Sequence, residues 1–429
     1  MALSVEVLTS FGELAGARES WRRLLARSGD PQATLSPAWL LAWWRVYGQD
    51  GDRALRACLV YDRARLIGLA PLLSRTTWHR PGIPFRRLEL IGSGEAEADE
   101  VTSEYIGVIA EAGRERSVAV ALAYALHRGR LGAWDELVLE RMKADSVMTR
   151  ALGEELGPRA GRLEAKATTI SHYVPLPSDW DAYLGRLSPS RRYRLKRALR
   201  DFERFTGGDY RLERAASEES FWRGFAILEE LHRERWRAAG LNGAFASARF
   251  WRFHRDVAPA LFRQGALDLL WLVARGEPVA AAYNLVWDGC VQFYQGGRRT
   301  DLPGAVKPGV VLHALAIGQA IRSGHREYDF LAGRARYKEE LGPARRRIVS
   351  LRATPRRSAR EGARRAAERS LRPLRDALVR RAPAPLLGRA SRVYGTHMAP
   401  AAAEASEQDP GRQGDPAVHW RFLPRIGIR

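Results

Sequence analysis

The sequence predicts a mixed α/β protein built from two similar halves and a basic tail. Three observations lead to this prediction: two pairs of apolar segments in matching places, a helix and a further strand after each pair, and a change of composition near residue 354. The chain has 429 residues, 45% of them apolar and 28% charged, which is enough for two or three domains with their own cores.

The first half is expected to contain a hairpin, a helix and a strand. Alternating and continuous apolar runs flank the short polar turn 62–64, and Ser36-Pro37 is suited to begin an earlier helix through Trp39, Trp43 and Trp44. The predicted elements are strands 54–61 (ALRACLVY) and 65–73 (RLIGLAPLL), helix 114–128 and strand 135–140.

The second half repeats this order. Leu59-Val60 and Leu272-Val273 occupy matching places 213 positions apart, which favours an internal duplication. The predicted elements are strands 267–275 (LDLLWLVAR) and 278–287 (PVAAAYNLVW) around the turn Gly276-Glu277, strand 290–296, helix 308–323 and strand 326–331. Ser188-Pro189, Ser217 and Ser247 each begin a further predicted helix.

These elements predict three segments. An N-terminal α/β domain is expected over 1–175 and a second over 176–353, while 354–429 is rich in Arg, Ala and Pro and is expected to be partly disordered.

The net charge of +21 is the usual sign of a nucleic-acid or membrane partner. Arginine outnumbers lysine by 65 to 5, however, and 13 arginines fall between residues 352 and 392. We therefore attribute most of the charge to coding bias and do not expect a nucleic-acid partner. Peripheral contact of the tail with anionic lipid is the most that we expect.

Several other classes of protein are not indicated. No apolar run is long enough to cross a bilayer, the N-terminus shows no secretory signal, and Cys58 and Cys290 form no framework, so a cytoplasmic location is expected. The chain has no HExxH, Walker or GxSxG motif, and no metal is expected.

Residues 290–309 carry the most chemical information. Strand 290–296 alternates, with Gln292 and Tyr294 on one face, and leads into the loop RRTDLPGAVKPG and the helix at 308. Arg298, Arg299 and Lys307 supply charge, glycines such as Gly304 and Gly309 allow close approach, and a helix N-terminus offers free N–H groups. This arrangement suits a pyrophosphate, although an ordinary strand-to-helix loop would show the same pattern.

The order of these elements resembles the GNAT acyltransferase superfamily, and in particular the bacterial acetyltransferases associated with cellulose and exopolysaccharide biosynthesis. The resemblance is carried by SPSRRYRLKRALRDFER (188–204), LHRERWRAAG (231–240), YDFLAGRARYKEELG (328–342) and EADEVTSEYIGVI (97–109). A similar tandem architecture occurs in Fem-type aminoacyl transferases. The fold implied is two tandem GNAT-like domains, each a mixed, mostly antiparallel sheet flanked by helices.

The resemblance implies acetyl-CoA or another acyl-CoA as donor, with the pyrophosphate on the 298–309 loop and the pantetheine along strand 290–296, where Tyr294 lies. The usual Arg/Gln-x-x-Gly-x-Gly/Ala signature is present only with altered spacing, from Arg299 through Gly304 to Gly309. Tyr337 occupies the place of the family's acid.

Several residues are candidates for the remaining roles. Asp329, Glu104 and His232 are candidate bases, and for each we weigh a structural alternative: an ion pair, a solvated acid and a packed helix histidine. Glu100 lies four residues before Glu104, would share its face in a helix or a strand, and is a candidate for binding the acceptor. Arg192 and Lys196, in a basic cluster over 191–200, and Lys338 beside Tyr337 are further candidates for binding the acceptor. The alternatives for the cluster are binding of the cofactor's ribose phosphate and an ordinary solvated basic helix.

The predicted function is CoA-dependent transfer of an acyl group, most simply acetyl, to an amine or hydroxyl, on a small molecule or a saccharide of polysaccharide or cell-envelope metabolism. One alternative is Fem-like transfer from aminoacyl-tRNA, in which the cluster at 191–200 would bind RNA. The other is a non-catalytic scaffold at the inner face of an envelope polysaccharide machine.

Overall fold

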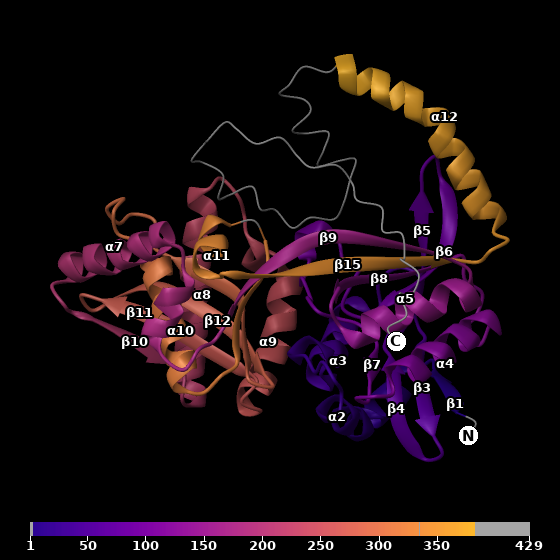
Figure 1. Cartoon of the computed structure of the whole chain (residues 1–429), viewed down its shortest axis with the longest axis horizontal. Coiled ribbons are helices and arrows are strands. Elements are labelled where there is room, and N and C mark those ends of the chain that lie inside the picture. The colour runs from indigo at the N-terminus through magenta and orange to yellow at the C-terminus, as the bar shows by residue number, and fades with distance from the viewer. Residues whose placement is uncertain (1–2, 334, 382–429) are drawn as a thin grey trace, which may run out of the picture.

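Two long strands, β9 (Arg162–Pro175) and β15 (Ala344–Thr354), run through the middle of the molecule and join its two halves (Figure 1). The computed structural model describes residues 3–333 and 335–381. β9 and β15 pair antiparallel with each other, and β9 also pairs with β14 (Glu327–Ala332) while β15 pairs with β8 (Glu136–Lys143). Among the described residues, an eleven-stranded sheet therefore extends across both halves in the order β10-β11-β12-β13-β14-β9-β15-β8-β6-β5-β2.

The N-terminal half contains strands β8, β6, β5 and β2 of this sheet and a second, four-stranded sheet in the order β1-β3-β4-β7. The predicted second strand divides at Pro71, which has no N–H to donate, so that β4 belongs to the small sheet and β5 to the large one. The elements are β1 (Ser4–Leu8), α1 (Phe11–Gly16), α2 (Arg18–Ala26), α3 (Pro37–Tyr47), β2 (Ala54–Leu55), β3 (Ala57–Asp62), β4 (Arg65–Ala70), β5 (Leu72–His79), β6 (Ile83–Leu90), β7 (Ile109–Ala110), α4 (Glu115–His127), β8 and α5 (Val147–Ala160).

The C-terminal half follows the same plan, with its helices on both faces of the sheet (Figure 1). Serines cap α7, α8 and α9 as the sequence predicts, because Ser188, Ser217 and Ser247 each accept a hydrogen bond from a first-turn N–H. The elements are α6 (Trp180–Arg186), α7 (Pro189–Thr206), β10 (Tyr210–Arg214), α8 (Glu218–Ala238), α9 (Ala248–Arg263), β11 (Leu267–Ala274), β12 (Glu277–Trp287), β13 (Cys290–Arg298), α10 (Pro308–Arg322), β14 and α11 (Arg336–Leu341).

The two halves show the predicted duplication. In each, a hairpin and a strand are followed by a helix and by a strand that pairs parallel to the previous one: β6 with β8, and β13 with β14. The predicted fold class, two tandem α/β units with mostly antiparallel sheets flanked by helices, is confirmed. The domain limits at 175 and 353 stay a prediction.

One hydrophobic core spans the halves. Trp39 and Trp43 of α3 are completely buried, and Trp39 contacts Phe253 of α9 edge to face, with 5.0 Å between ring centroids. A second core lies under α7 and α10 and contains Tyr328, Phe330 and Ile317. Packing therefore fixes the halves relative to each other.

Part of the predicted tail is helical: α12 (Ala359–Arg381) lies beside the β5–β6 hairpin (Figure 1). Its Glu361 accepts a hydrogen bond from Arg352 of β15 at 2.8 Å. The disorder and the lipid contact are expected for the whole tail, 354–429; residues 382–429 of it lie outside the described residues, and the lipid contact stays a prediction.

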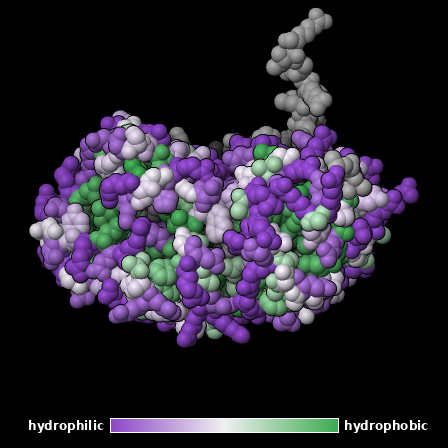
Figure 2. All heavy atoms as spheres, turned by 90° about the horizontal axis from the view of Figure 1, so that it is seen from below, coloured by the Kyte–Doolittle hydropathy of each residue, from purple (hydrophilic) through white to green (hydrophobic). Residues whose placement is uncertain are grey.

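Hydrophilic residues cover most of the face shown in Figure 2, with separate hydrophobic areas on each half. In the described part of the chain, no helix is long and apolar enough to span a membrane.

Candidate active site

A pocket opens where the parallel strands β13 and β14 part. Their pairing ends at Gln292 and Asp329, and β13 bulges at Tyr294, the residue between the partners of Asn284 and Tyr283. The space beside them, about 250 Å³, is here named the C-terminal pocket. Its lining includes Arg235, Ala281, Phe293, Gly296, Gly297, Arg298, Arg299, Thr300, Leu302, Gly304, Val306, Lys307, Pro308, Gly309, Val310, Leu312, His313 and Tyr337.

The C-terminal pocket is strongly cationic at one end. Four cations line it, and none of the described lining residues is acidic: the cations are Arg235, Arg298, Arg299 and Lys307. The N-terminus of α10 also faces it, and unlike α7, α8 and α9 this helix has no side-chain cap on its first N–H groups. Free N–H groups, the positive end of the helix dipole and the cations together suit a phosphate or pyrophosphate.

A residue of α8, Glu234, fixes the start of the loop between β13 and α10. The Glu234 carboxylate accepts hydrogen bonds from Thr300, from its backbone N–H at 2.7 Å and from its hydroxyl at 3.0 Å. Asp301 accepts from Arg299 Nε at 2.8 Å within the same loop. Hydrogen bonds at Arg299, Thr300 and Asp301 therefore hold the first residues of the cationic loop in place.

The other end of the C-terminal pocket is aromatic. The ring of Tyr337 stacks on His313, with centroids 5.1 Å apart and an interplanar angle of 11°, and lies edge to face with Phe293. The ring of His313 is also within 3.0 Å of the Tyr328 hydroxyl, and burial lowers its pKa to about 3, so it is neutral near pH 7. A neutral, fixed imidazole therefore orients Tyr337.

Our sequence reading missed two of these residues, His313 and Arg235. His313 is a single polar residue in the first turns of a helix that is otherwise apolar, which is a usable signal of a specific contact. Arg235 lies within the stretch 231–240 that carries part of the GNAT resemblance.

Glu104 reaches from the N-terminal half to the end of β14. Its Oε2 accepts a hydrogen bond from Ala332 N at 2.7 Å, and Lys338 Nζ donates to Ala332 O at 2.6 Å. Glu104 and Lys338, both predicted site residues, therefore bind the backbone N–H and the backbone C=O of Ala332, respectively. Burial raises the pKa of Glu104 to about 7, although Lys338 and the Ala332 N–H oppose the rise. Near neutral pH this carboxyl can accept or release a proton.

The geometry does not favour Asp329 as the base, because its carboxylate is engaged by four donors away from the C-terminal pocket. It is completely buried, does not line the C-terminal pocket, and accepts from four donors. These are Ser171 Oγ at 2.7 Å, Tyr105 Oη at 2.7 Å, Leu331 N at 2.7 Å and Arg346 Nη1 at 2.9 Å. Burial raises its pKa, and the Arg346 guanidinium opposes that rise. The ion pair that the sequence left open as the alternative is present.

Tyr294 also differs from the prediction. Its side chain lies on the opposite face of the sheet from the C-terminal pocket, where its hydroxyl donates to Val101 O and lies 3.0 Å from His254 Nε2. Tyr294 therefore packs between the two halves of the molecule and not beside the predicted site of the acyl-CoA donor.

His232 lies in α8 where that helix crosses β13. It is 1% exposed, it does not line the C-terminal pocket, and burial lowers its pKa to about 3. A base with so low a pKa takes up a proton poorly at pH 7, so the geometry does not favour this candidate.

Glu100 and Glu104 do not share a face. Thr102 and Tyr105 have φ values of 53° and 58°, so this stretch is neither helix nor strand. Glu100 turns to Arg141, with which it is ion-paired, while Glu104 turns to Ala332.

The basic cluster at 191–200 lies on α7. Arg192 donates to Leu187 O at 3.3 Å, and Lys196 is exposed. Arg191 and Arg194 are paired with Glu339 and Glu340 of α11, at 3.1 and 3.0 Å. Much of this charge therefore attaches α7 to the helix that bears Tyr337, and binding of an acceptor here stays a prediction.

The comparison with protein families bears directly on the pocket-forming part of the chain. Residues 189–339 match the family described as acetyltransferase (GNAT) domain. This range holds the basic loop, α10, β14 and Tyr337. The part of the chain that matches this family is therefore the part that forms the C-terminal pocket. The association with exopolysaccharide-related members stays a prediction.

Among solved structures, FemX shows a similar fold: it is 11% identical with a TM-score of 0.53, covering 83% of this chain and 98% of that one. A conserved protein from Bacteroides thetaiotaomicron is 12% identical with a TM-score of 0.49, covering 81% and 100%. A tandem GNAT protein from the clavulanic acid pathway is 14% identical with a TM-score of 0.42, covering 82% and 98%. A sequence comparison with curated proteins gives no match.

Proposed function

We propose that the protein is an acyl-CoA-dependent acyltransferase whose donor binds in the C-terminal pocket. The observation that carries the proposal is the meeting of four cations, an uncapped helix N-terminus and Tyr337 in one pocket of the GNAT domain. The donor would supply an activated thioester. The residues present fit it: the cationic end suits its pyrophosphate, and the apolar lining from Ala281, Phe293 and Leu312 suits the pantetheine arm.

Two proton transfers are needed when an acyl group passes from a thiol to an amine or hydroxyl. The acceptor must lose a proton, and the departing sulfur must gain one. We assign the first role to Glu104, since its pKa of about 7 lets it be ionised and still basic at neutral pH. Like Asp329, Glu104 does not line the C-terminal pocket, but its carboxylate accepts only one hydrogen bond from a described residue, Ala332 N, whereas that of Asp329 accepts four. We assign the second to the Tyr337 hydroxyl, because the ring lines the pocket and is fixed by His313.

The acceptor proposed is an amine or hydroxyl, on a saccharide or a precursor of a cell-envelope polymer. This choice rests on the resemblance of the sequence to exopolysaccharide-associated acetyltransferases. A screen of amine and hydroxyl acceptors, read as thiol release from acetyl-CoA, would identify it.

The donor site is tested by calorimetric titration of the full chain with acetyl-CoA. Replacing both Arg298 and Lys307 by Ala removes two charge-assisted contacts and is expected to weaken binding about 100-fold. The control variant, Arg252→Ala with Lys166→Ala, makes the same change in net charge at two exposed positions away from the pocket, and is expected to bind like the wild type. Equal weakening in both variants, or no binding by the wild type, would refute the donor site.

A further inference from the structure

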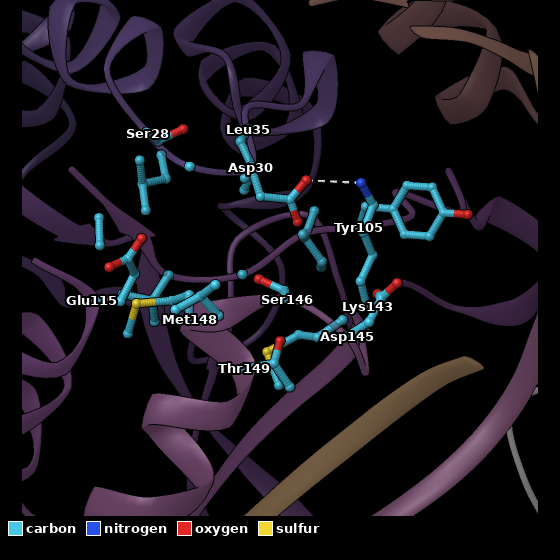
Figure 3. A pocket seen from close by; sticks show the side chains of 18 of the residues that line it. Ser28, Asp30, Leu35, Tyr105, Glu115, Lys143, Asp145, Ser146, Met148 and Thr149 are labelled. Atoms are coloured by element: carbon cyan, nitrogen blue, oxygen red, sulfur yellow. Dashed lines mark hydrogen bonds and ion pairs between the residues drawn. The ribbon is translucent and has the colours of Figure 1, made fainter. Parts of the chain in front are cut away.

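A second pocket, here named the N-terminal pocket, lies in the other half of the molecule (Figure 3). It has a volume of about 250 Å³ and is formed where Gly29-Asp30, β7, the start of α4, the end of β8 and the start of α5 meet. The start of α4 corresponds, in the duplicated plan, to the start of α10 in the C-terminal pocket. The two pockets therefore use equivalent helix ends.

The charges in the two pockets differ. Both helices have a cation as N-cap, Lys307 for α10 and Arg114 for α4, but the first helical residue of α10 is Pro308, whereas that of α4 is Glu115, whose carboxylate points into the N-terminal pocket (Figure 3). Its Oε1 lies close to the backbone of Gly29, since a Cβ on that glycine would be 3.1 Å from it. The N-terminal pocket thus has acidic lining residues, which the described lining of the C-terminal pocket lacks.

Glu115 has no partner of opposite charge. It is 8% exposed and makes no hydrogen bond or ion pair with any described residue. The other charged residues of the pocket have partners of opposite charge: Asp30 pairs with Lys143 at 2.8 Å, Arg346 pairs with Glu327 and Asp329, each at 2.9 Å, and Asp145 lies 3.7 Å from Arg346. The α4 dipole favours negative charge at this position but supplies no side-chain donor. The Glu115 carboxylate is thus left without a partner among the described side chains and faces the pocket, where a cation can pair with it.

We propose that the N-terminal pocket binds a small organic cation, a molecule with a protonated amine and a short apolar body. The amine would lie against the Glu115 carboxylate, and the Ser146 and Thr149 hydroxyls can accept its remaining hydrogen bonds. Met142, Met148 and Leu35 line the same space and suit the apolar body. A metal ion is a poorer occupant, because the described residues contain no group of three or more potential metal ligands. This site is separate from the donor site and does not depend on it.

Methionine reports on this site without an activity assay. The chain contains four methionines, and two of them, Met142 and Met148, line the N-terminal pocket while none lines the C-terminal one. The experiment is a titration of the full chain, labelled with ¹³C at the methionine methyl groups, with pentylamine and, in parallel, with 1-pentanol. Saturable shifts of both methyl signals with pentylamine, at concentrations about tenfold lower than with 1-pentanol, are expected. Equal response to the two compounds, or no response to pentylamine, would overturn the proposal.

A pair of variants assigns the effect to Glu115. Glu115→Gln keeps the shape of the side chain and is expected to weaken pentylamine binding about tenfold, while Glu154→Gln, at an exposed position of α5, should leave it unchanged. If Glu115→Gln fails to fold, the comparison of pentylamine with 1-pentanol on the wild type still tests whether the pocket prefers a cation. Acetyl-CoA is expected to leave both methyl signals unshifted, and saturable shifts with acetyl-CoA would overturn the assignment to a cation. Failure of the donor site itself would appear only in the calorimetric titration.

Discussion

Glu104 is the residue whose ionisation is best placed to control the reaction. Its pKa of about 7 is raised by burial and held back by Lys338 and by the N–H of Ala332. A base works only when ionised, so the rate of acyl transfer is expected to rise as the pH increases through about 7 and to level off above it.

Replacing Glu104 by Gln is expected to lower kcat about 100-fold or more and to remove this rise. The measurement is thiol release from acetyl-CoA between pH 5.5 and 9, with the acceptor found by screening. Glu100→Gln is the control, because Glu100 is paired with Arg141 and does not contact Ala332. An unchanged pH profile in the Glu104 variant would contradict the assignment and leave Glu104 as a support of β14.

Asp329 is expected to matter for stability rather than for chemistry. All four of its contacts are donors, so Asp329→Asn would turn an amide N–H₂ toward one of them and leave Arg346 with one buried partner fewer. The expected loss is about 3 kcal/mol in the free energy of unfolding, measured with urea. Asp256→Asn, which breaks an exposed pair with Arg45, should cost less than about 1 kcal/mol. A stable but inactive Asp329 variant would contradict this account.

At the scale of elements, the contact of α8 with β13 positions the donor loop. A Cβ on Gly297 would lie 2.3 Å from the backbone N of His232, so α8 must move if the residue becomes larger. Gly297→Ala is expected to cost about 2 kcal/mol of stability and to weaken acetyl-CoA binding, because Arg235 and Glu234 belong to α8.

Gly304→Ala, in the loop that follows β13, is the matched control. No atom lies within 4 Å of its Cβ position, so its unfolding free energy should stay within about 0.5 kcal/mol of the wild type. Urea denaturation and calorimetric titration of both variants give the comparison, and equal losses in the two would contradict the role of close packing at Gly297.

Helix starts, turns and the cationic loop could be predicted from the sequence because each depends on residues that are neighbours in the chain. Serine caps, the turn glycines and the glycine-bearing cationic loop before α10 are set by neighbouring residues, and they predict the helix starts and the cationic pocket lining. The side chains that cross between elements could not be read in this way. Glu100 and Glu104 diverge because Thr102 and Tyr105 have positive backbone φ values. Asp329 of β14 forms an ion pair with Arg346 of β15, although β15 is hydrogen-bonded to β8 and β9 and not to β14.

At the scale of the whole molecule, the exchange of central strands makes the two halves depend on each other. β9 follows α5 of the first half in sequence but pairs with β14 of the second, while β15 follows α11 and pairs with β8 of the first. No local pattern reveals such pairing between distant strands, which is why the sequence suggests two separate domains.

The expected consequence is one cooperative unfolding transition for the full chain in scanning calorimetry, since neither half can lose its structure without exposing a strand of the other. The hydrophobic core shared by α3 and α9 also favours a single unfolding transition, because it joins the two halves. Two separate transitions would contradict this expectation and support independent domains divided near residue 175.

The position of β15 also bears on synthesis at the ribosome. This strand, residues 344–354, lies between β8 and β9, both of which are made nearly two hundred residues earlier. The neighbouring edges of β8 and β9 must therefore wait, unpaired, until residues 344–354 have been synthesised. A nascent chain of this protein would need protection from aggregation during that interval.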